Sequence, residues 1–279
     1  MADVDVLVPT RGRPVELATT LAGLAAQTGV EFSLTISDQS DGDASWETPS
    51  ARTVIRWLER RGVEVALHRH GPPRGMAEQR AFLLSCATAP AVLYLDDDVW
   101  LEPGALARLH RALGELGCGM VGAAMQALGH AEDRRPEEVE SFSVWDGPVE
   151  PETLVKDGPG WDRWRLHNAA NGLHLAESVG VDGPGSAVPS PDVYVPYKVA
   201  WVAGCVLFDR ARLVEAGGFE FWRDVPPDAH GEDVYSQQQV MARSGAAGIL
   251  PPGAYHQESP TALPDRGISA VDALPARPT

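Results

Sequence analysis

Three consecutive aspartates, Asp96, Asp97 and Asp98, follow directly on the apolar run AVLYL at residues 91–95. Such a run is typical of a buried strand, and adjacent carboxylates at its end repel one another and lose hydration if they are covered. Acidic residues can simply solvate a turn after a strand. Clustered carboxylates also hold hard cations such as Mg²⁺ or Mn²⁺, which suits a phosphate-rich ligand.

The elements that must position these carboxylates are short apolar runs alternating with helical patterns over the first 125 residues. Strands are expected at residues 5–10, 32–37, 63–68, 91–95 and 119–127, and helices from Pro14, at about 53–61 and 75–87, and after Pro103. This alternation predicts an α/β fold with a mostly parallel central sheet flanked by helices. Ligands bind such sheets at the carboxyl ends of the strands, where residues 9–13, Asp38 and residues 96–98 all lie.

The remainder of the chain changes twice in composition and in hydrophobic pattern. Residues 126–196 are rich in Pro, Gly and acidic residues, which indicates loops and short elements. From residue 197 order returns, with a strand expected over 197–210, a helix over 211–219 and a helix over 231–245. The last 25 residues contain His256 and otherwise suggest a loose tail.

Composition excludes some classes of function. The chain has 279 residues, 44% of them hydrophobic, and a net charge of −16, so a folded enzyme is expected and phosphate-backbone binding to nucleic acid is not. Three separated cysteines indicate free thiols in a reducing cytosol. The acidic start MADVDVLVPT is not a secretory signal, and the longest apolar run, 199–208, is too short for a transmembrane segment. We expect a cytoplasmic protein.

Five segments, in order, carry a resemblance to a known family: VLVPTRGRPVELATTLAGLAAQ, ISDQSDGD, RGMAEQRAFLLSCATAPAVLYLDDDV, VAGCVLFDRARLVEAGGFEFW and GEDVYSQQQVMARSG. The ordered set resembles the family 2 glycosyltransferases, which have the GT-A fold and a DXD motif. The resemblance covers about residues 3–126 and 197–256. The chain departs from the family pattern after Arg80, where Ala81 stands in place of the common Asn.

The resemblance implies a nucleotide-diphosphate sugar as donor substrate and a site that binds it. Asp38 would contact the nucleotide base, although an ordinary Asx turn in DQSDGD is an alternative. Asp97 points to the other side of the strand from its neighbours and is expected to support the site. The residues implied in donor binding are Pro9, Thr10, Arg11, Asp38, Arg74, Gly75, Arg80, Asp96, Asp97 and Gly204.

Transfer of the sugar releases a diphosphate, and a bound Mn²⁺ or Mg²⁺ would neutralise the charge that develops on it. Asp98 is the expected metal ligand. Asp96, on the same side of an extended chain, would face the ribose or a metal-bound water, and His256 is a further candidate ligand.

Inverting transfer also needs a base that takes the proton of the acceptor hydroxyl. The segment GEDV supplies Asp233, our first choice, and Glu232, the second, although acidic residues also simply suit a helix start.

The expected organisation is a donor-binding half (1–126), a variable insert that forms the acceptor region (127–196), an acceptor and catalytic half (197–256) and a C-terminal tail (257–279). The acceptor would be a small molecule or a glycan. Whether the protein forms a homo-oligomer is left open by the sequence. Trp145, Trp161 and Trp164 of the insert could stack on sugar rings or serve packing.

The alternatives to a glycosyltransferase are a sugar-nucleotide nucleotidyltransferase, a phosphatase of the haloacid-dehalogenase type, or a non-catalytic nucleotide- or carbohydrate-binding protein. A nucleotidyltransferase would normally show a Gly-rich phosphate loop with a lysine after the first strand, and this sequence lacks one. A phosphatase of the haloacid-dehalogenase type would carry its aspartates after the first strand.

Overall fold

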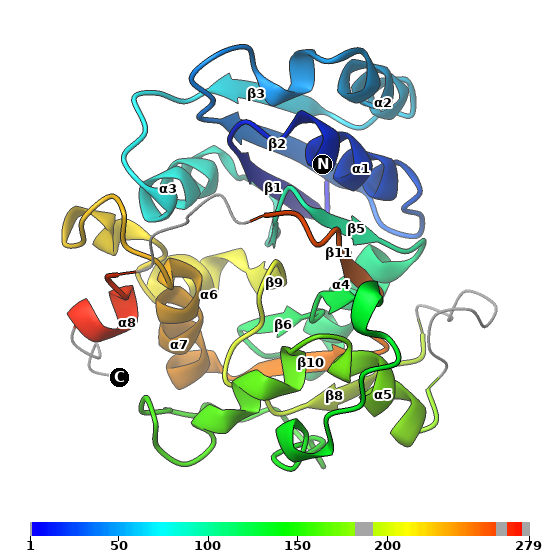
Figure 1. Ribbon diagram of the computed structural model, residues 1–279, viewed down its shortest axis with the longest axis vertical. Coiled ribbons are helices and arrows are strands. Elements are labelled where there is room, and N and C mark those ends of the chain that lie inside the picture. Colours follow the sequence, from blue (N-terminus) through cyan, green and yellow to red (C-terminus); the bar gives the residue numbers. More distant parts are fainter. Residues whose placement is uncertain (1, 182–191, 261–266, 275–279) are drawn as a thin grey trace.

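The computed structural model describes residues 2–181, 192–260 and 267–274 (Figure 1). The main sheet has eight strands in the order β3-β2-β1-β4-β9-β6-β10-β8, and a smaller sheet has the order β5-β11-β7. The strands are β1 (Val4–Thr10), β2 (Phe32–Asp38), β3 (Val65–Arg69), β4 (Ala91–Leu95), β5 (Val99–Leu101), β6 (Met120–Gly122), β7 (Gln126–Ala127), β8 (Val195–Tyr197), β9 (Cys205–Asp209), β10 (Ala246–Leu250) and β11 (Ala254–His256). The α-helices are α1 (Pro14–Ala25), α2 (Pro49–Arg60), α3 (Met76–Cys86), α4 (Ala105–Leu116), α5 (Asn171–Ser178), α6 (Arg210–Glu215), α7 (Glu232–Ser244) and α8 (Ala270–Ala273).

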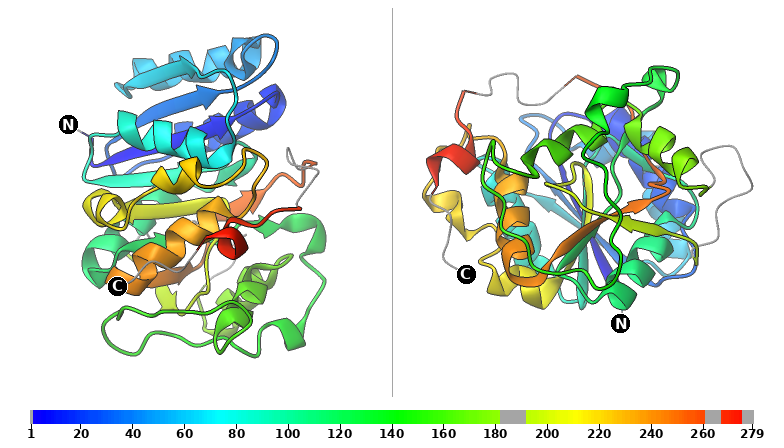
Figure 2. Two further views of the ribbon diagram at one scale, coloured as in Figure 1. Left: turned by 90° about the vertical axis from the view of Figure 1, so that its left-hand side faces the viewer. Right: turned by 90° about the horizontal axis from the view of Figure 1, so that it is seen from below.

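The first half of the main sheet forms as the alternation of strand and helix predicts. Strands β3, β2, β1 and β4 run parallel, and every residue of β1 is buried because helices cover both faces of the sheet. Figure 2 shows this layering, with α1, α2 and α4 on one face and α3, α6 and α7 on the other. The expected α/β fold with a mostly parallel central sheet is confirmed.

The sequence pattern predicts one strand over 197–210, and this prediction is wrong. The structure has two strands separated by a loop. Strand β8 ends at Tyr197, residues 198–204 leave the sheet, and β9 begins at Cys205. The Gln237 side chain of α7 holds the loop away from the sheet by bonding both the N–H (2.7 Å) and the carbonyl (2.8 Å) of Val202. Gly204, with φ +74°, then turns the chain into β9. Helix contacts therefore override a locally strand-like sequence.

The small sheet is built from segments far apart in the chain. The apolar run 119–127 divides into β6 of the main sheet and β7 of the small one, and β11 pairs with both β5 and β7. Neither β5 nor β11 is expected from the sequence. Their antiparallel pairing sets His256 opposite Val99, directly beyond the three aspartates.

The described residues of the middle segment form loops, short 3₁₀ helices and α5, as its composition predicts, together with β7 and the start of β8. Within the tail, α8 is an ordered helix that the sequence does not predict. Residues 182–191 of the expected insert and residues 261–266 and 275–279 of the expected tail lie outside the described residues. No helix in the described part of the chain combines the length and apolar character that crossing a bilayer requires.

Candidate functional site

The carboxyl ends of β1, β2 and β4 meet at one edge of the sheet and bring the predicted residues together. Thr10 at the end of β1 lies beside Asp38 at the end of β2 in the strand register. The Thr10 hydroxyl also donates a 2.6 Å hydrogen bond to Asp97 Oδ2, just beyond β4. The rim anticipated from the sequence therefore exists.

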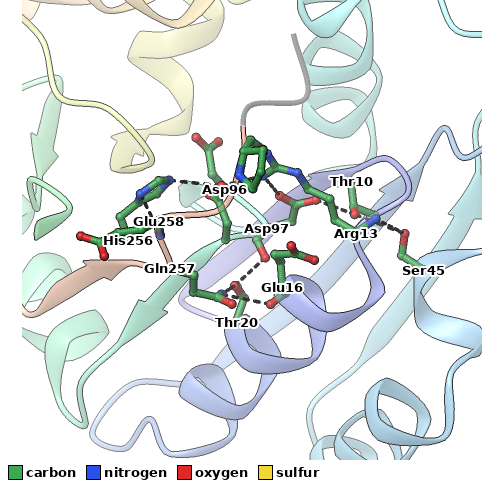
Figure 3. Close-up of polar contacts among 12 residues, drawn as sticks. Thr10, Arg13, Glu16, Thr20, Ser45, Asp96, Asp97, His256, Gln257 and Glu258 are labelled. Carbon is green, nitrogen blue, oxygen red and sulfur yellow. Dashed lines mark hydrogen bonds and ion pairs between the residues drawn. The ribbon is translucent and has the colours of Figure 1, made fainter. Parts of the chain in front are cut away.

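Asp97 lies beneath this rim and supports it. Its carboxylate accepts hydrogen bonds from Thr10 and from Arg13 Nη1 (3.1 Å), and its carbonyl accepts one from the Thr20 hydroxyl (2.8 Å) (Figure 3). Burial raises the pKa of Asp97 to about 7, although the bond from Thr10 and the charge of Arg13 act in the opposite direction. These contacts fit the supporting role predicted for Asp97.

Asp98 and His256 face each other across the start of the small sheet. His256 Nε2 lies 3.2 Å from Asp98 Oδ2, and the backbone N–H of Gln257 donates to the Asp98 carbonyl (2.9 Å). Burial would raise the pKa of Asp98, but the hydrogen bond and charge of His256 and the charge of Arg13 outweigh it and lower that pKa. The same hydrogen bond raises the pKa of His256. The pair presents a charged carboxylate beside an imidazole.

The three predicted metal ligands do not converge on one point. Asp98 and His256 are in contact, but Asp96 turns toward Arg80, 3.0 Å from its Nη2. Within the described residues, no group of three His, Cys, Asp or Glu side chains is arranged to hold a metal ion. The donor chemistry of Asp98 and His256 still suits Mn²⁺ or Mg²⁺, because such ions are commonly held by one or two protein ligands together with substrate phosphates. The residues fit a metal that shares its coordination with a diphosphate.

Arg80 links the two halves of the site. Its buried guanidinium donates to Asp96 Oδ1 through Nη2 (3.0 Å) and to Glu232 Oε1 through Nε (3.0 Å). Burial would lower the pKa of Arg80, but the charges of Asp96 and Glu232 raise it above its ordinary value. The donor-binding role that the resemblance implies for Arg80 stays a prediction. In the structure its guanidinium positions the two carboxylates.

Asp233 and Glu232 occupy the first turn of α7, as expected, but their surroundings differ. Glu232 is buried and bound to Arg80, whereas Asp233 is partly exposed. Asp233 lines a cavity of ≈ 10 Å³ together with Asp96, Gly204 and Gln237. Burial and the neighbouring charge of Glu232 raise the pKa of Asp233 to about 7. Asp233, and not Glu232, lines this cavity, and its role as the base stays a prediction.

Gly204 shapes the cavity wall through its backbone. Its carbonyl accepts the Asp96 N–H (2.9 Å), and a Cβ at this position would lie 2.6 Å from Met125 Sδ. A side chain here would meet that atom and strain the positive φ.

Asp38 is buried and organises its own loop. One carboxylate oxygen accepts the N–H of Ser40 and the other that of Ser45, each at 2.6 Å. This is the turn arrangement that the sequence left as the alternative. Contact with a base stays a prediction, but the loop does wall a pocket of ≈ 200 Å³, together with Gln39 and Arg69. Gln39 Nε2 is buried without a hydrogen-bond partner among the described residues.

The remaining predicted donor-binding residues lie on or near the same rim. Pro9 is buried in β1, and Arg11 is exposed and paired with Asp41 (3.1 Å). Arg74 is exposed before α3. Gly75, with φ +101°, lies where a Cβ would collide with the backbone of Pro227.

Two functional candidates escape the sequence reasoning. Arg13 falls in the rim segment 9–13, but its pairing with Asp97 and Asp98 spans more than eighty residues and has no local signal. Trp201 packs against two tryptophans of the insert. Its ring centroid lies 4.9 Å from that of Trp161 and 6.1 Å from that of Trp164. Because Gln237 binds the next residue, this cluster sits beside the helix that carries Asp233. Trp145 instead donates to the Ala246 carbonyl (3.2 Å), a packing role.

Comparison with family models gives a match to "Glycosyl transferase family 2" over residues 5–160. The chain belongs to this family. Comparison with curated proteins finds no significant match. Among solved structures, S. aureus TarS has a TM-score of 0.54 at 14% identity, with 92% of this chain and 37% of TarS covered.

Two ligand complexes are similar to the same degree. TarS 1–349 with UDP-GlcNAc gives a TM-score of 0.56 at 13% identity over 94% of this chain and 60% of that one. A mannosyltransferase from Pyrobaculum calidifontis with GDP-Man and Mn²⁺ gives 0.55 at 15% identity over 94% and 59%. The chain thus spans less than two thirds of each of these structures. The likeness confirms the glycosyltransferase fold of the GT-A type.

Proposed function

We propose that the protein transfers a sugar from a nucleotide-diphosphate sugar to an acceptor hydroxyl, with inversion at the anomeric carbon. The observation that carries the proposal is the Arg80 bridge. It joins Asp96, at the carboxyl end of β4, to Glu232, at the start of α7, and the cavity beside it is bordered by one donor-side carboxylate, Asp96, and by the candidate base Asp233. Family membership and the likeness to nucleotide-sugar complexes support this assignment.

The donor nucleotide would lie over the rim of β1, β2 and β4, within residues 1–126. The pocket beside Gln39 and Arg69 would take the base, because the donor groups that line it can bond a carbonyl acceptor. Uracil and guanine both offer such an oxygen. Asp98 and His256 would hold Mn²⁺ or Mg²⁺ with the diphosphate, where the ion supplies Lewis-acid stabilisation of the leaving group.

Proton transfer is assigned to Asp233. Its raised pKa places it near neutral, where a carboxylate is a competent general base, and its Oδ atoms would accept the proton of the acceptor hydroxyl. Glu232 is held by Arg80, and its charge keeps the pKa of Asp233 high. Gly204 forms part of the wall of the same cavity.

The acceptor would approach from the side of the insert, residues 127–196. Trp164 and Trp201 stack with an interplanar angle of 11° and are both partly exposed, which suits contact with the flat face of a sugar or another ring. The acceptor is therefore proposed to be a ring-bearing small molecule or glycan.

Binding and turnover of donors test the proposal. Isothermal titration of UDP, GDP and dTDP with and without Mn²⁺ should show one nucleoside diphosphate that binds more tightly with the metal. NMR of the corresponding nucleotide sugar should then show slow metal-dependent hydrolysis, a side reaction of transferases. Binding without hydrolysis or transfer would favour the non-catalytic binding protein, and absence of nucleotide binding would refute the proposal.

A further inference from the structure

Arg13 places a positive charge at the site where the divalent cation is expected. Its Nη1 donates to Asp97 Oδ1 (3.1 Å), as Figure 3 shows. The same Nη1 donates to Asp98 Oδ2 (2.5 Å), and Nη2 donates to the Pro260 carbonyl. His256 Nε2 lies 3.2 Å from the same Asp98 oxygen. Asp98 Oδ2 is thus shared by an arginine and by the second candidate metal ligand.

These contacts are not those of a surface ion pair. The side chain of Arg13 is only 13% exposed, and those of Asp97 and Asp98 are 8% and 9% exposed. The pairing is therefore poorly screened by solvent. A divalent ion bound to Asp98 Oδ2 would stand within a few ångströms of the guanidinium, since Arg13 Nη1 donates to that same oxygen. Two like charges at that separation in a partly dry site exclude each other.

The backbone and the side chain of Arg13 are held differently. The backbone N–H donates to Ser45 Oγ (3.3 Å), and Arg13 directly precedes α1, so the main chain is anchored. The guanidinium ends a long flexible side chain and can move without disturbing the helix. Its planar fork also matches a diphosphate, which lies next to the metal in a donor complex.

We propose that Arg13 is an internal counter-cation of Asp97 and Asp98 that is exchanged for the divalent metal when the donor's diphosphate enters. The metal then binds together with the diphosphate and only weakly before it. On exchange the guanidinium leaves Asp98 and Pro260 and pairs with the diphosphate. This proposal rests on the proposed function for the identity of the diphosphate, but its central prediction concerns Mn²⁺ alone.

Manganese binding measured by electron paramagnetic resonance tests the exchange without turnover. In the absence of nucleotide, Arg13→Gln should bind Mn²⁺ about tenfold or more tightly than wild type, because a neighbouring positive charge has been removed. Arg111→Gln is the matched control, since Arg111 is an exposed arginine of α4 paired with Glu115 (2.8 Å), and it should bind Mn²⁺ as wild type does. Arg13→Gln combined with Asp98→Asn should lose the gain. A folded Arg13→Gln protein with wild-type Mn²⁺ affinity would overturn the proposal.

Pyrophosphate provides a second readout that needs no variant. In wild type it should strengthen Mn²⁺ binding about tenfold or more, and by linkage Mn²⁺ should strengthen pyrophosphate binding by the same factor. Independent binding of the two would contradict the exchange even if Arg13→Gln did not fold. Arg13→Lys keeps the charge and should retain weak binding of Mn²⁺ alone. Failure of the proposed function is distinct, since it would appear as absent nucleotide binding or absent donor hydrolysis.

Discussion

Replacement of Arg80 tests the buried bridge between the two halves of the site. Arg80→Met keeps the bulk and the apolar stem of the side chain and removes the charge that holds Asp96 and Glu232. The Asp96 side chain is 31% exposed and can regain water, but that of Glu232 is only 7% exposed. The main consequence is therefore one stranded carboxylate, on Glu232.

The magnitude follows from that burial. Two unit charges about 4 Å apart interact by about 4 kcal/mol at the effective dielectric constant of about 20 that suits protein sites. Removing one partner of a buried pair typically costs about 3–5 kcal/mol. We expect Arg80→Met to lower the free energy of unfolding by about that amount, which is a large share of the roughly 5–15 kcal/mol available to a native protein.

Urea unfolding followed by fluorescence measures this loss, since the chain has eight tryptophans. Glu232→Gln in the Arg80→Met background should restore about 2 kcal/mol or more, because the stranded charge is then gone. Arg111→Met, at an exposed pair on α4, should cost no more than about 1 kcal/mol. The reasoning is refuted if Arg80→Met costs no more than this surface control, or if the Arg80 and Glu232 substitutions are simply additive.

Three further predictions concern catalysis. Asp233→Asn should lower kcat by about 10²–10⁴-fold while the dissociation constant of the donor nucleotide, measured by calorimetry, stays near wild type; near wild-type turnover would transfer the role to Glu232. Because burial raises the pKa of Asp233 to about 7 and the base must be ionised, kcat/KM should fall about tenfold per pH unit as the pH drops below about 7; a profile flat from pH 5 to about 8 would contradict this. Trp201→Ala should raise the KM for the acceptor about 5- to 150-fold, with donor hydrolysis by NMR unchanged, as expected if about 1–3 kcal/mol of ring stacking is lost; equal loss of donor hydrolysis would place Trp201 in the donor site instead.

The local pattern of the sequence is sufficient for the first half of the fold. Strands β1, β2 and β4 match the predicted ranges within a residue or so, because apolar runs between helical repeats signal buried parallel strands without reference to distant residues. The rule that strand ends carry ligands then places Thr10, Asp38 and Asp96–Asp98 on one rim. Asp233 at a helix start is likewise a local feature.

Tertiary structure alone decides how these residues are paired. Residues 197–210 are apolar enough for one strand, yet contacts from Gln237 hold part of them as a loop. His256 meets Asp98, and Arg80 meets Glu232, across more than 150 residues of chain. Arg13 pairs with Asp97 and Asp98, at the place where the sequence suggests a metal. Residue type and local spacing reveal which charged side chains a site contains. Which of them pair depends on through-space distance and burial, and these arise only when the whole sheet has formed.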